Sequence, residues 1–247
     1  MTTKYGFTKY SPDDFATWIE SVSLARTVTT IQQHHTWRPN YDAFTGQNHF
    51  EMQRSMKHHH VSNNGWSDIG QHFSIFPDGS ILTGRPLHQS PACIYGANSG
   101  AICIESIGDF DKNRDEMKEI QRQSILKTTA ALLKTFSKIP RTSAGIVYHH
   151  WFDLNTGARR NGSGVTKSCP GTAFFGGNKI ANFEENFLPQ VLALIGEPTP
   201  DRSASSDNPI RLVRVTASEL NIRQGPGIDH PRVSGQPPVL MGSILRV

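Results

Sequence analysis

The stretch Ala101-Ile102-Cys103-Ile104-Glu105-Ser106-Ile107 is apolar enough to predict a central strand that is buried on both faces of a sheet. Thr27–His35 is rich in β-branched residues, which favour strands, and predicts a second strand. Ile146–His149 predicts another buried strand. The chain therefore contains the strands of a buried sheet, and two of them run into paired histidines.

Shorter strands and several helices are expected around this sheet. His72–Phe76 and Ser80–Thr83 predict two strands joined by Pro77-Asp78-Gly79, a strong turn signal. Helical patterns cover four segments: Ser11 (as N-cap) to about Leu24, His49–His60, Arg114–Lys138 with Met117, Ile120, Ile125, Leu132 and Leu133 on one side, and Asn178–Ile195 with a kink or interruption at Pro189. Short strands mixed with long helices predict an α/β fold, a mixed central sheet flanked by helices.

The composition changes near residue 196. Residues 196–208 are polar, contain Pro and Ser, and offer almost nothing to bury, which predicts a linker. Residues 209–247 alternate like short strands around the turn Gly225-Pro226-Gly227 and predict a small all-β module. The expected organisation is a domain over 1–195, a linker over 196–208 and a second module over 209–247.

Bulk composition limits the class of protein. Of the 247 residues, 36% are hydrophobic and 19% charged, which indicates a globular chain and not a disordered one. No stretch approaches the roughly 20 apolar residues that cross a bilayer, and the N-terminus lacks the apolar core of a signal peptide. We therefore expect action in the cytoplasm or release by a route without a cleaved signal. The net charge of +4 favours an anionic partner, such as nucleic acid, a membrane surface or cell-wall polymers.

The cysteines indicate a reduced compartment or a metal role. Only Cys93, Cys103 and Cys169 are present, too few and too scattered for a disulfide framework. We therefore expect a reduced compartment, or a metal role for one of the three.

Three places in the sequence could together bind a metal ion: His34-His35, His149-His150, and Cys169. Two imidazoles and one thiolate suit Zn²⁺, and three protein ligands leave the fourth position for water, as in catalytic zinc sites. Each histidine pair stands at a strand end, where neighbouring side chains point to opposite faces, so one member of each pair can face a shared metal. Periodicity leaves open which member it is.

Six motifs follow one another along the chain: Ile31–Thr36, Trp66–Phe73, Asp78–Ile81 with Gly84-Arg85, Ala101–Glu105, Ile146–His149 and Thr166–Gly171. This ordered set resembles a known family, the zinc-dependent N-acetylmuramoyl-L-alanine amidases of type 2, which are related to the peptidoglycan recognition proteins. The resemblance covers roughly residues 25–195.

The resemblance implies roles for five residues. The zinc ligands would be His34, His149 and Cys169. Lys167 matches a lysine thought to stabilise the oxyanion of the tetrahedral intermediate; its alternative is a solvated loop charge. Glu105 stands where many of these amidases have an acid that could move a proton between the attacking water and the leaving amine; its alternative is an ordinary strand-end carboxylate.

Two positions depart from the family pattern. Some relatives have a catalytic tyrosine where this chain has Gln71, and an amide is neither an acid nor a base, so more of the proton transfer falls on Glu105. Relatives often have a histidine where Cys93 stands, and this cysteine either contacts substrate or fills space.

The tail around Val215–Gly227 resembles a bacterial SH3-like module, a type that commonly binds cell-wall peptide or glycan. The printed chain stops at Val247, sooner than such a module normally ends. We therefore expect a module that binds wall but is truncated.

The resemblance implies hydrolysis of the amide between N-acetylmuramic acid and L-alanine in peptidoglycan, with Zn²⁺ as cofactor. We expect a monomer that binds neither membrane nor nucleic acid; only the positive net charge suggests nucleic acid, and no interleaving of aromatic and basic residues supports it. Lytic action after holin-type or other non-classical release, or from a phage, and cytoplasmic recycling both fit the missing signal; the wall-binding module expected in the tail favours lysis. The rival is a receptor of the same fold that binds peptidoglycan without cutting it. Such receptors generally lose a zinc ligand, typically the cysteine, whereas Cys169 and Lys167 are present here.

Overall fold

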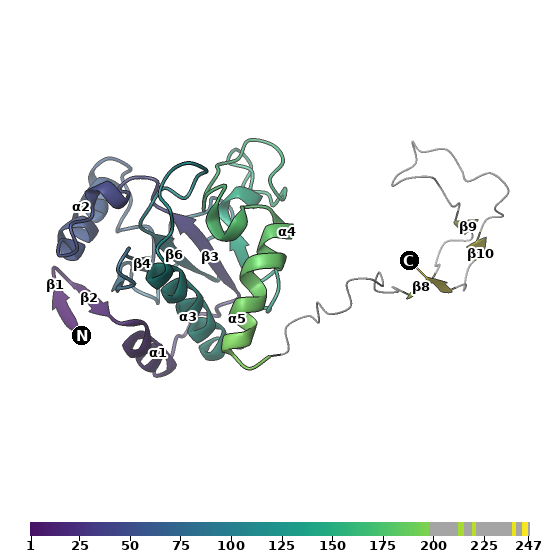
Figure 1. The fold of residues 1–247 in the computed structure, drawn as a ribbon, viewed down its shortest axis with the longest axis horizontal. Coiled ribbons are helices and arrows are strands. Elements are labelled where there is room, and N and C mark those ends of the chain that lie inside the picture. The colour runs from purple at the N-terminus through teal and green to yellow at the C-terminus, as the bar shows by residue number, and fades with distance from the viewer. Residues whose placement is uncertain (198–211, 215–218, 221–238, 241–243, 247) are drawn as a thin grey trace. The chain divides into compact units, whose positions relative to one another are not determined.

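The computed structural model describes residues 1–197, 212–214, 219–220, 239–240 and 244–246, and the chain divides into two compact units, Met1–Thr199 and Pro200–Val247 (Figure 1). In the second unit the described residues form two antiparallel pairs: β8 (Leu212–Arg214) with β11 (Ile244–Arg246), and β9 (Glu219–Leu220) with β10 (Val239–Leu240). Most of the expected linker and SH3-like module lies outside the described residues.

The first unit contains a seven-stranded mixed sheet in the order β1-β2-β5-β4-β6-β3-β7. Strands β4, β6, β3 and β7 run parallel to one another, and β1, β2 and β5 complete the sheet by antiparallel pairing. The strands are β1 (Thr2–Lys4), β2 (Phe7–Tyr10), β3 (Thr30–His35), β4 (Phe73–Ile75), β5 (Ile81–Thr83), β6 (Ala101–Ser106) and β7 (Ile146–Tyr148). The predicted mixed α/β architecture is confirmed, although the edge hairpin β1–β2 was not predicted.

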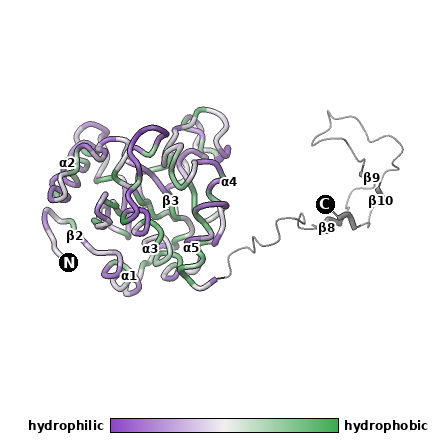
Figure 2. The backbone as a smooth tube through the Cα atoms, viewed as in Figure 1, coloured by the Kyte–Doolittle hydropathy of each residue, from purple (hydrophilic) through white to green (hydrophobic). Residues whose placement is uncertain are grey.

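Helices cover both faces of the sheet. On one face α1, α3 and α5 lie side by side, and on the other α2 packs against Phe7, Phe76 and Leu82 (Figure 1). The sheet thus has a hydrophobic core on each face. Ile81 and Leu82 are neighbours in β5 and point to opposite faces, so Ile81 belongs to the core with Phe15 and Ile125, and Leu82 belongs to the core with Phe7 and Phe76. The helices are α1 (Pro12–Glu20), α2 (His49–Ser62), α3 (Glu119–Thr135), α4 (Ile180–Asn182) and α5 (Leu188–Leu194). Hydrophobic segments gather in the interior of this unit (Figure 2).

The ends of α1 and α3 show which local signals were informative. Ser11 caps α1 as predicted, because its Oγ accepts a hydrogen bond from the backbone N–H of Asp14 at 3.2 Å. The predicted start of α3 at Arg114 is wrong, since the helix begins at Glu119. Ile120, expected on its apolar side, is 59% exposed, because it lies in the first turn, outside the covered part of the helix.

The predicted helix over 178–195 is interrupted as expected. A π-helical segment, Phe183–Phe187, separates α4 from α5, and Pro189 lies in the first turn of α5, where a missing N–H costs no hydrogen bond. Phe183 and Phe187 are fully buried against Tyr148. This packing supports the strand that leads into the second histidine pair. Among the described residues, no helix has the length and apolar character to cross a membrane.

Candidate metal centre and groove

Three neighbouring parallel strands deliver the candidate site. β6, β3 and β7 lie side by side, and their carboxyl ends meet at one edge of the sheet. His34 lies at the end of β3, opposite Glu105 of β6 in the strand register, and His149 follows directly after β7. In α/β sheets, ligands bind at this edge, beyond the carboxyl ends of the strands.

His34, His149 and Cys169 come together although they are far apart in the sequence. Nδ1 of His34 lies 3.2 Å from Nδ1 of His149 and 3.5 Å from Sγ of Cys169. One ligand atom from each residue lies within 4.8 Å of the other two, and all three side chains are buried. The convergence that the predicted metal site requires is therefore present.

The other histidine of each pair points elsewhere. Nδ1 of His35 accepts a hydrogen bond from the backbone N–H of Phe110 at 3.1 Å, on the opposite side of β3 from His34. Nδ1 of His150 donates to the carbonyl oxygen of Lys167 at 2.7 Å. The expectation that strand alternation separates both pairs is correct for β3 but wrong for the second pair, because β7 ends at Tyr148 and His149 begins a 3-10 turn, His149–Trp151.

A hydrogen-bonded loop holds Cys169 in place. The hydroxyl of Ser168 donates to Asp111 at 2.8 Å, and the side-chain amide of Asn178 donates to the Ser168 carbonyl at 2.8 Å. The carbonyl of Cys169 accepts from the backbone N–H of His150 at 2.7 Å, which ties the cysteine to the second histidine pair. Sequence reasoning missed Asp111 and Asn178, whose contacts with this loop cross long intervals of chain.

Burial sets the protonation of the three groups. It lowers the pKa of His34 well below the usual value and that of His149 to about 3, with the positive charge of Lys167 contributing to both. Both imidazoles are therefore neutral near neutral pH, the form that binds metals. Burial also raises the pKa of the Cys169 thiol to about 12.

Glu105 and Lys167 accompany this cluster in one groove of about 1040 Å³. Burial raises the pKa of Glu105 to about 7, and the ammonium of Lys167 acts in the opposite direction. A carboxyl group with a pKa near 7 can both take up and release a proton at neutral pH. The structure thus brings all five predicted site residues to the same groove.

Aromatic and basic side chains also line the groove. Trp37 and Arg38 come from the loop after β3, and His59 and His60 come from α2. Trp66 stacks near His60, with ring centroids 4.8 Å apart. Sequence reasoning missed the contribution of α2 to this groove.

Gln71 is buried in the groove wall. Its side-chain amide donates to the hydroxyl of Ser74 at 3.0 Å, and its own oxygen has no partner among the described residues. Gln71 thus lines the groove and offers an amide only.

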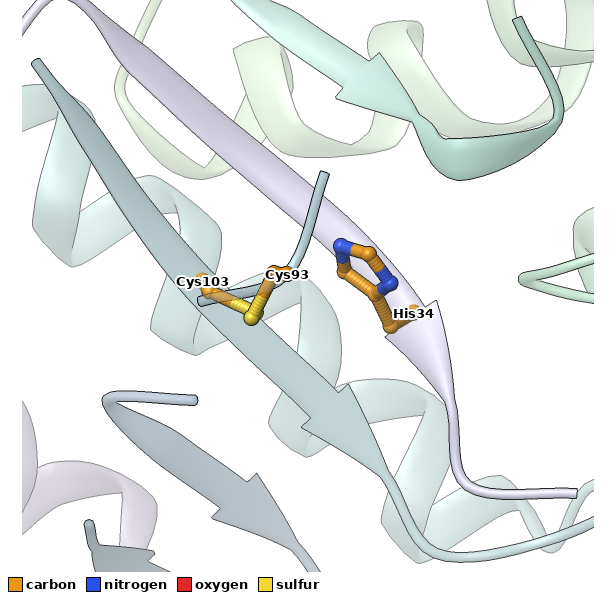
Figure 3. Close-up of side chains that lie close together, drawn as sticks. All are labelled: His34, Cys93 and Cys103. Carbon is orange, nitrogen blue, oxygen red and sulfur yellow. A yellow bond between two sulfur atoms is a disulfide. The ribbon is translucent and has the colours of Figure 1, made fainter. Parts of the chain in front are cut away.

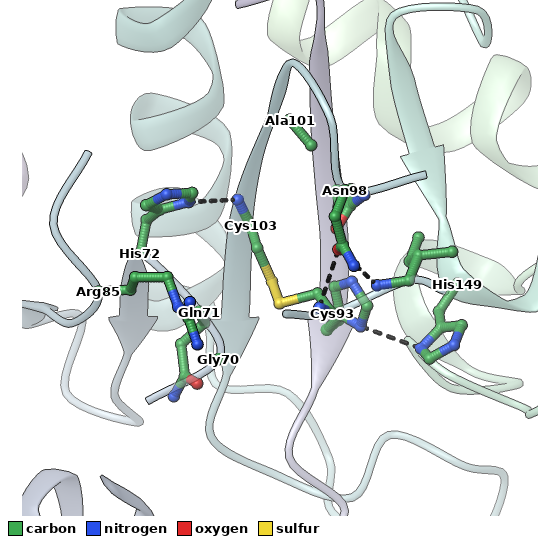
Figure 4. Close-up of a disulfide and its surroundings, with 12 residues drawn as sticks. Gly70, Gln71, His72, Arg85, Cys93, Asn98, Ala101, Cys103 and His149 are labelled. Atoms are coloured by element: carbon green, nitrogen blue, oxygen red, sulfur yellow. Dashed lines mark hydrogen bonds between the residues drawn. A yellow bond between two sulfur atoms is a disulfide. The ribbon is translucent and has the colours of Figure 1, made fainter. Parts of the chain in front are cut away.

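The expected reduced state of the cysteines is wrong for two of the three, because Cys93 and Cys103 form a disulfide (Figure 4). The bond connects the loop before β6 to the strand itself. Asn98 supports the loop by accepting from the backbone N–H of Cys93 at 3.0 Å, and His72 accepts from that of Cys103 at 3.0 Å. Cys169 is the free cysteine, so the predicted metal role falls on the one thiol left available.

Two loops beside the groove pack directly against each other. Gly157 has a positive φ of 69°, and a Cβ there would lie 2.6 Å from the carbonyl oxygen of Tyr95. The carboxylate of Asp153 holds the same loop through backbone N–H groups, including that of Val165 at 3.1 Å. The loop between the second histidine pair and Cys169 is therefore held by its own hydrogen bonds, and it packs against the loop that carries Cys93.

Comparison with known proteins assigns the family. The family model described as N-acetylmuramoyl-L-alanine amidase matches residues 24–172, more than half of the chain, and the chain belongs to this family. An N-acetylmuramoyl-L-alanine amidase of Homo sapiens is 28% identical over 144 residues, 58% of this chain but 22% of the human protein. The chain thus spans about a fifth of that relative's length.

Two further relatives carry the name of peptidoglycan recognition. Peptidoglycan-recognition protein SC2 of Drosophila melanogaster is 28% identical over 150 residues, which are 61% of this chain and 72% of that protein. Among solved structures, wild-type Drosophila PGRP-LB aligns with a TM-score of 0.49 and 20% identity, over 74% of this chain and 91% of that chain.

Proposed function

We propose that this chain is a zinc-dependent amidase that hydrolyses the bond between N-acetylmuramic acid and L-alanine in peptidoglycan. The observation that carries the proposal is the convergence of His34, His149 and Cys169 in a groove that is also lined by Glu105 and Lys167. Membership in the amidase family supports the reaction class. A receptor that only binds peptidoglycan has no need of an acid with a pKa near 7 beside three metal-binding groups.

The three groups fit a zinc ion. Bonds of about 2.0–2.3 Å in a tetrahedral shell separate the ligand atoms by about 3.3–3.8 Å. The observed separations of 3.2 Å between the two imidazole nitrogens and 3.5 Å between nitrogen and sulfur are close to that range. The imidazoles are neutral, and a coordinating thiol loses its proton to the metal charge.

The protein's own residues supply the remaining chemistry. Zinc bound by His34, His149 and Cys169 would polarise the amide carbonyl and lower the pKa of water to about 7. The Glu105 carboxylate accepts a proton from the attacking water and returns it to the amine of the departing L-alanine. The Lys167 ammonium faces the same groove and stabilises the negative charge that develops on the carbonyl oxygen.

Removal of the metal tests the zinc requirement. We expect a strong chelator to abolish release of stem peptides from purified peptidoglycan, and stoichiometric Zn²⁺ to restore it, because in this proposal the metal supplies the activated water that attacks the carbonyl. The measurement is the mass of the released fragments together with the metal content of the dialysed protein. Full activity at zero metal content would contradict zinc dependence. Binding of muropeptide by the zinc-loaded protein, without new amino groups, would favour the receptor.

The contribution of Lys167 can be measured separately. We expect Lys167→Met to lower kcat by about 100-fold, in the range for loss of one donor to a developing oxyanion, with KM little changed. Lys134→Met, at an exposed position in the last turn of α3, is the matched control and should retain full kcat. An unchanged kcat in Lys167→Met would mean that this lysine is a solvated loop charge.

A lytic role is the biological form of this proposal. The groove is open and lined by aromatic and basic groups, which suits a long polymer with carboxylates. We propose that the protein acts as a monomer on assembled wall after leaving the cytoplasm, in the manner of an endolysin or autolysin, and that residues 209–247 assist wall binding. We expect the protein to clear suspensions of bacteria stripped of their outer layers, at rates similar to its cleavage of soluble muropeptide. Activity on soluble muropeptide alone would indicate a recycling role.

A further inference from the structure

The Cys93–Cys103 disulfide lies directly beside a candidate metal ligand. A ring nitrogen of His34 and the two sulfur atoms all lie within 4.8 Å of one another (Figure 3). His34 is therefore common to two groups of metal-binding atoms: one with His149 and Cys169, the other with Cys93 and Cys103. In the second group the sulfurs are bonded to each other, so they cannot act as thiolate ligands.

One ring nitrogen of His34, Nε2, makes no hydrogen bond among the described residues. Its Nδ1 contacts His149 and Cys169, whereas its Nε2 is buried and has no hydrogen-bond partner among the described residues. A buried nitrogen without a partner carries a desolvation cost. A ligand for that nitrogen would remove the cost, and the side chain itself is only 4% exposed.

The two sulfurs differ in access from the groove. Cys93 lines the groove and is partly exposed, whereas Cys103 lies inside β6 and is fully buried. A thiolate that enters the groove therefore reaches Cys93 first. It forms a mixed disulfide with Cys93 and expels the Cys103 thiolate, which takes up a proton. The second thiol of a dithiol reductant then displaces Cys93, so the protein gains two thiols while the reductant is oxidised to its own disulfide.

We propose that reduction of this disulfide creates a second metal site, formed by His34, Cys93 and Cys103, which binds Zn²⁺ or a similar thiophilic divalent ion. One imidazole and two thiolates are a favoured ligand set for zinc. After reduction the sulfurs separate to non-bonded contact, close to the spacing of about 3.8 Å between two sulfurs on one zinc ion. While the disulfide is intact, its sulfurs cannot bind a metal ion together with His34, so His34 is available to the site with His149 and Cys169. That last consequence rests on the proposed function; the second site itself does not.

The test isolates the second site by removing the only other thiol. In Cys169→Ser the remaining two cysteines are those of the disulfide. Cobalt(II) serves as the probe, because thiolate ligation gives an intense charge-transfer absorption. We expect none in the oxidised variant. After treatment with dithiothreitol and its removal without air, we expect the absorption to appear and to saturate at one cobalt per chain.

Two further variants separate the outcomes. In Cys169→Ser combined with His34→Ala, cobalt affinity of the reduced protein should fall at least 10-fold; unchanged affinity would show that His34 is no ligand and would overturn the proposal. The variant lacking all three cysteines should not respond to reductant. Two titratable thiols in folded, reduced Cys169→Ser without charge-transfer absorption would also overturn it.

The wild-type full chain gives a second readout, in which absorption should rise on reduction as thiolate ligands are added. Failure of the oxidised wild type to bind metal would instead contradict the proposed function.

Discussion

His149→Ala is expected to lose its bound zinc and to lower kcat/KM at least 100-fold. Loss of an outer partner of a metal ligand typically costs 10–100-fold in affinity or activity, and a direct ligand should cost more. The side chain is buried, and its Nδ1 lies 3.2 Å from that of His34, so no neighbouring histidine can replace it without movement of the backbone. Metal content by mass spectrometry and the rate of stem-peptide release are the two measurements.

The adjacent histidine provides the matched control for metal binding. His150 donates to the Lys167 carbonyl and points away from the cluster, so His150→Ala should keep one equivalent of zinc. His58→Ala, at an exposed position of α2 outside the groove, should keep both zinc and activity. If His149→Ala keeps zinc and His150→Ala loses it, the ligand is His150, and the assignment of His149 is wrong.

Glu105→Gln is expected to lower kcat by about 10²–10⁴-fold, the usual contribution of a positioned acid or base, while leaving zinc bound. The amide keeps the size of the side chain but cannot accept the proton of the attacking water. Because Gln71 also offers only an amide, no second acid or base among the groove-lining residues stands at that position to take over the role. Glu20→Gln, at the exposed end of α1, is the matched control and should retain full activity.

The stability of the metal-free protein shows whether an inactive Glu105→Gln is folded. Burial raises the pKa of Glu105 from 4.5 to about 7, so between these values the native state holds a proton that the unfolded state releases. This group therefore lowers stability progressively as pH rises through that window, and the full cost is present above it. Near pH 8 the substitution should raise the free energy of unfolding by no more than about 3 kcal/mol, and near pH 4 by nothing. Urea unfolding at both pH values measures this; a destabilised variant near pH 8 would contradict the raised pKa.

The sheet was predictable because burial leaves a direct pattern in the sequence. Continuous apolar residues in 101–107 and 146–149 match β6 and β7, and the turn at Pro77-Asp78-Gly79 joins β4 and β5. The hairpin β1–β2 left no such pattern, since all three residues of β1 are exposed. Helix limits differed by several residues, because a helix can end before its hydrophobic periodicity does.

The candidate site was predictable only as a set of residue types. Strand alternation could not choose between His34 and His35, and it does not apply at His149, which lies in a 3-10 turn. The choice came from resemblance to a family, and the roles of the five site residues stay predictions. The disulfide could not be predicted, because one cysteine lies in a loop and the other in a strand, and only the fold brings them into contact.

The strand ends that carry His34 and Glu105 belong to β3 and β6, each of which is hydrogen-bonded to a neighbour on both sides. Such interior strands open to solvent only when the whole domain unfolds, whereas edge segments such as β1 open locally at much lower free energy. Fraying at the N-terminal edge therefore does not reach His34 or Glu105. The spacing of these two side chains persists for as long as the sheet is folded, so heat or denaturant should disrupt it together with the tertiary structure in one cooperative step.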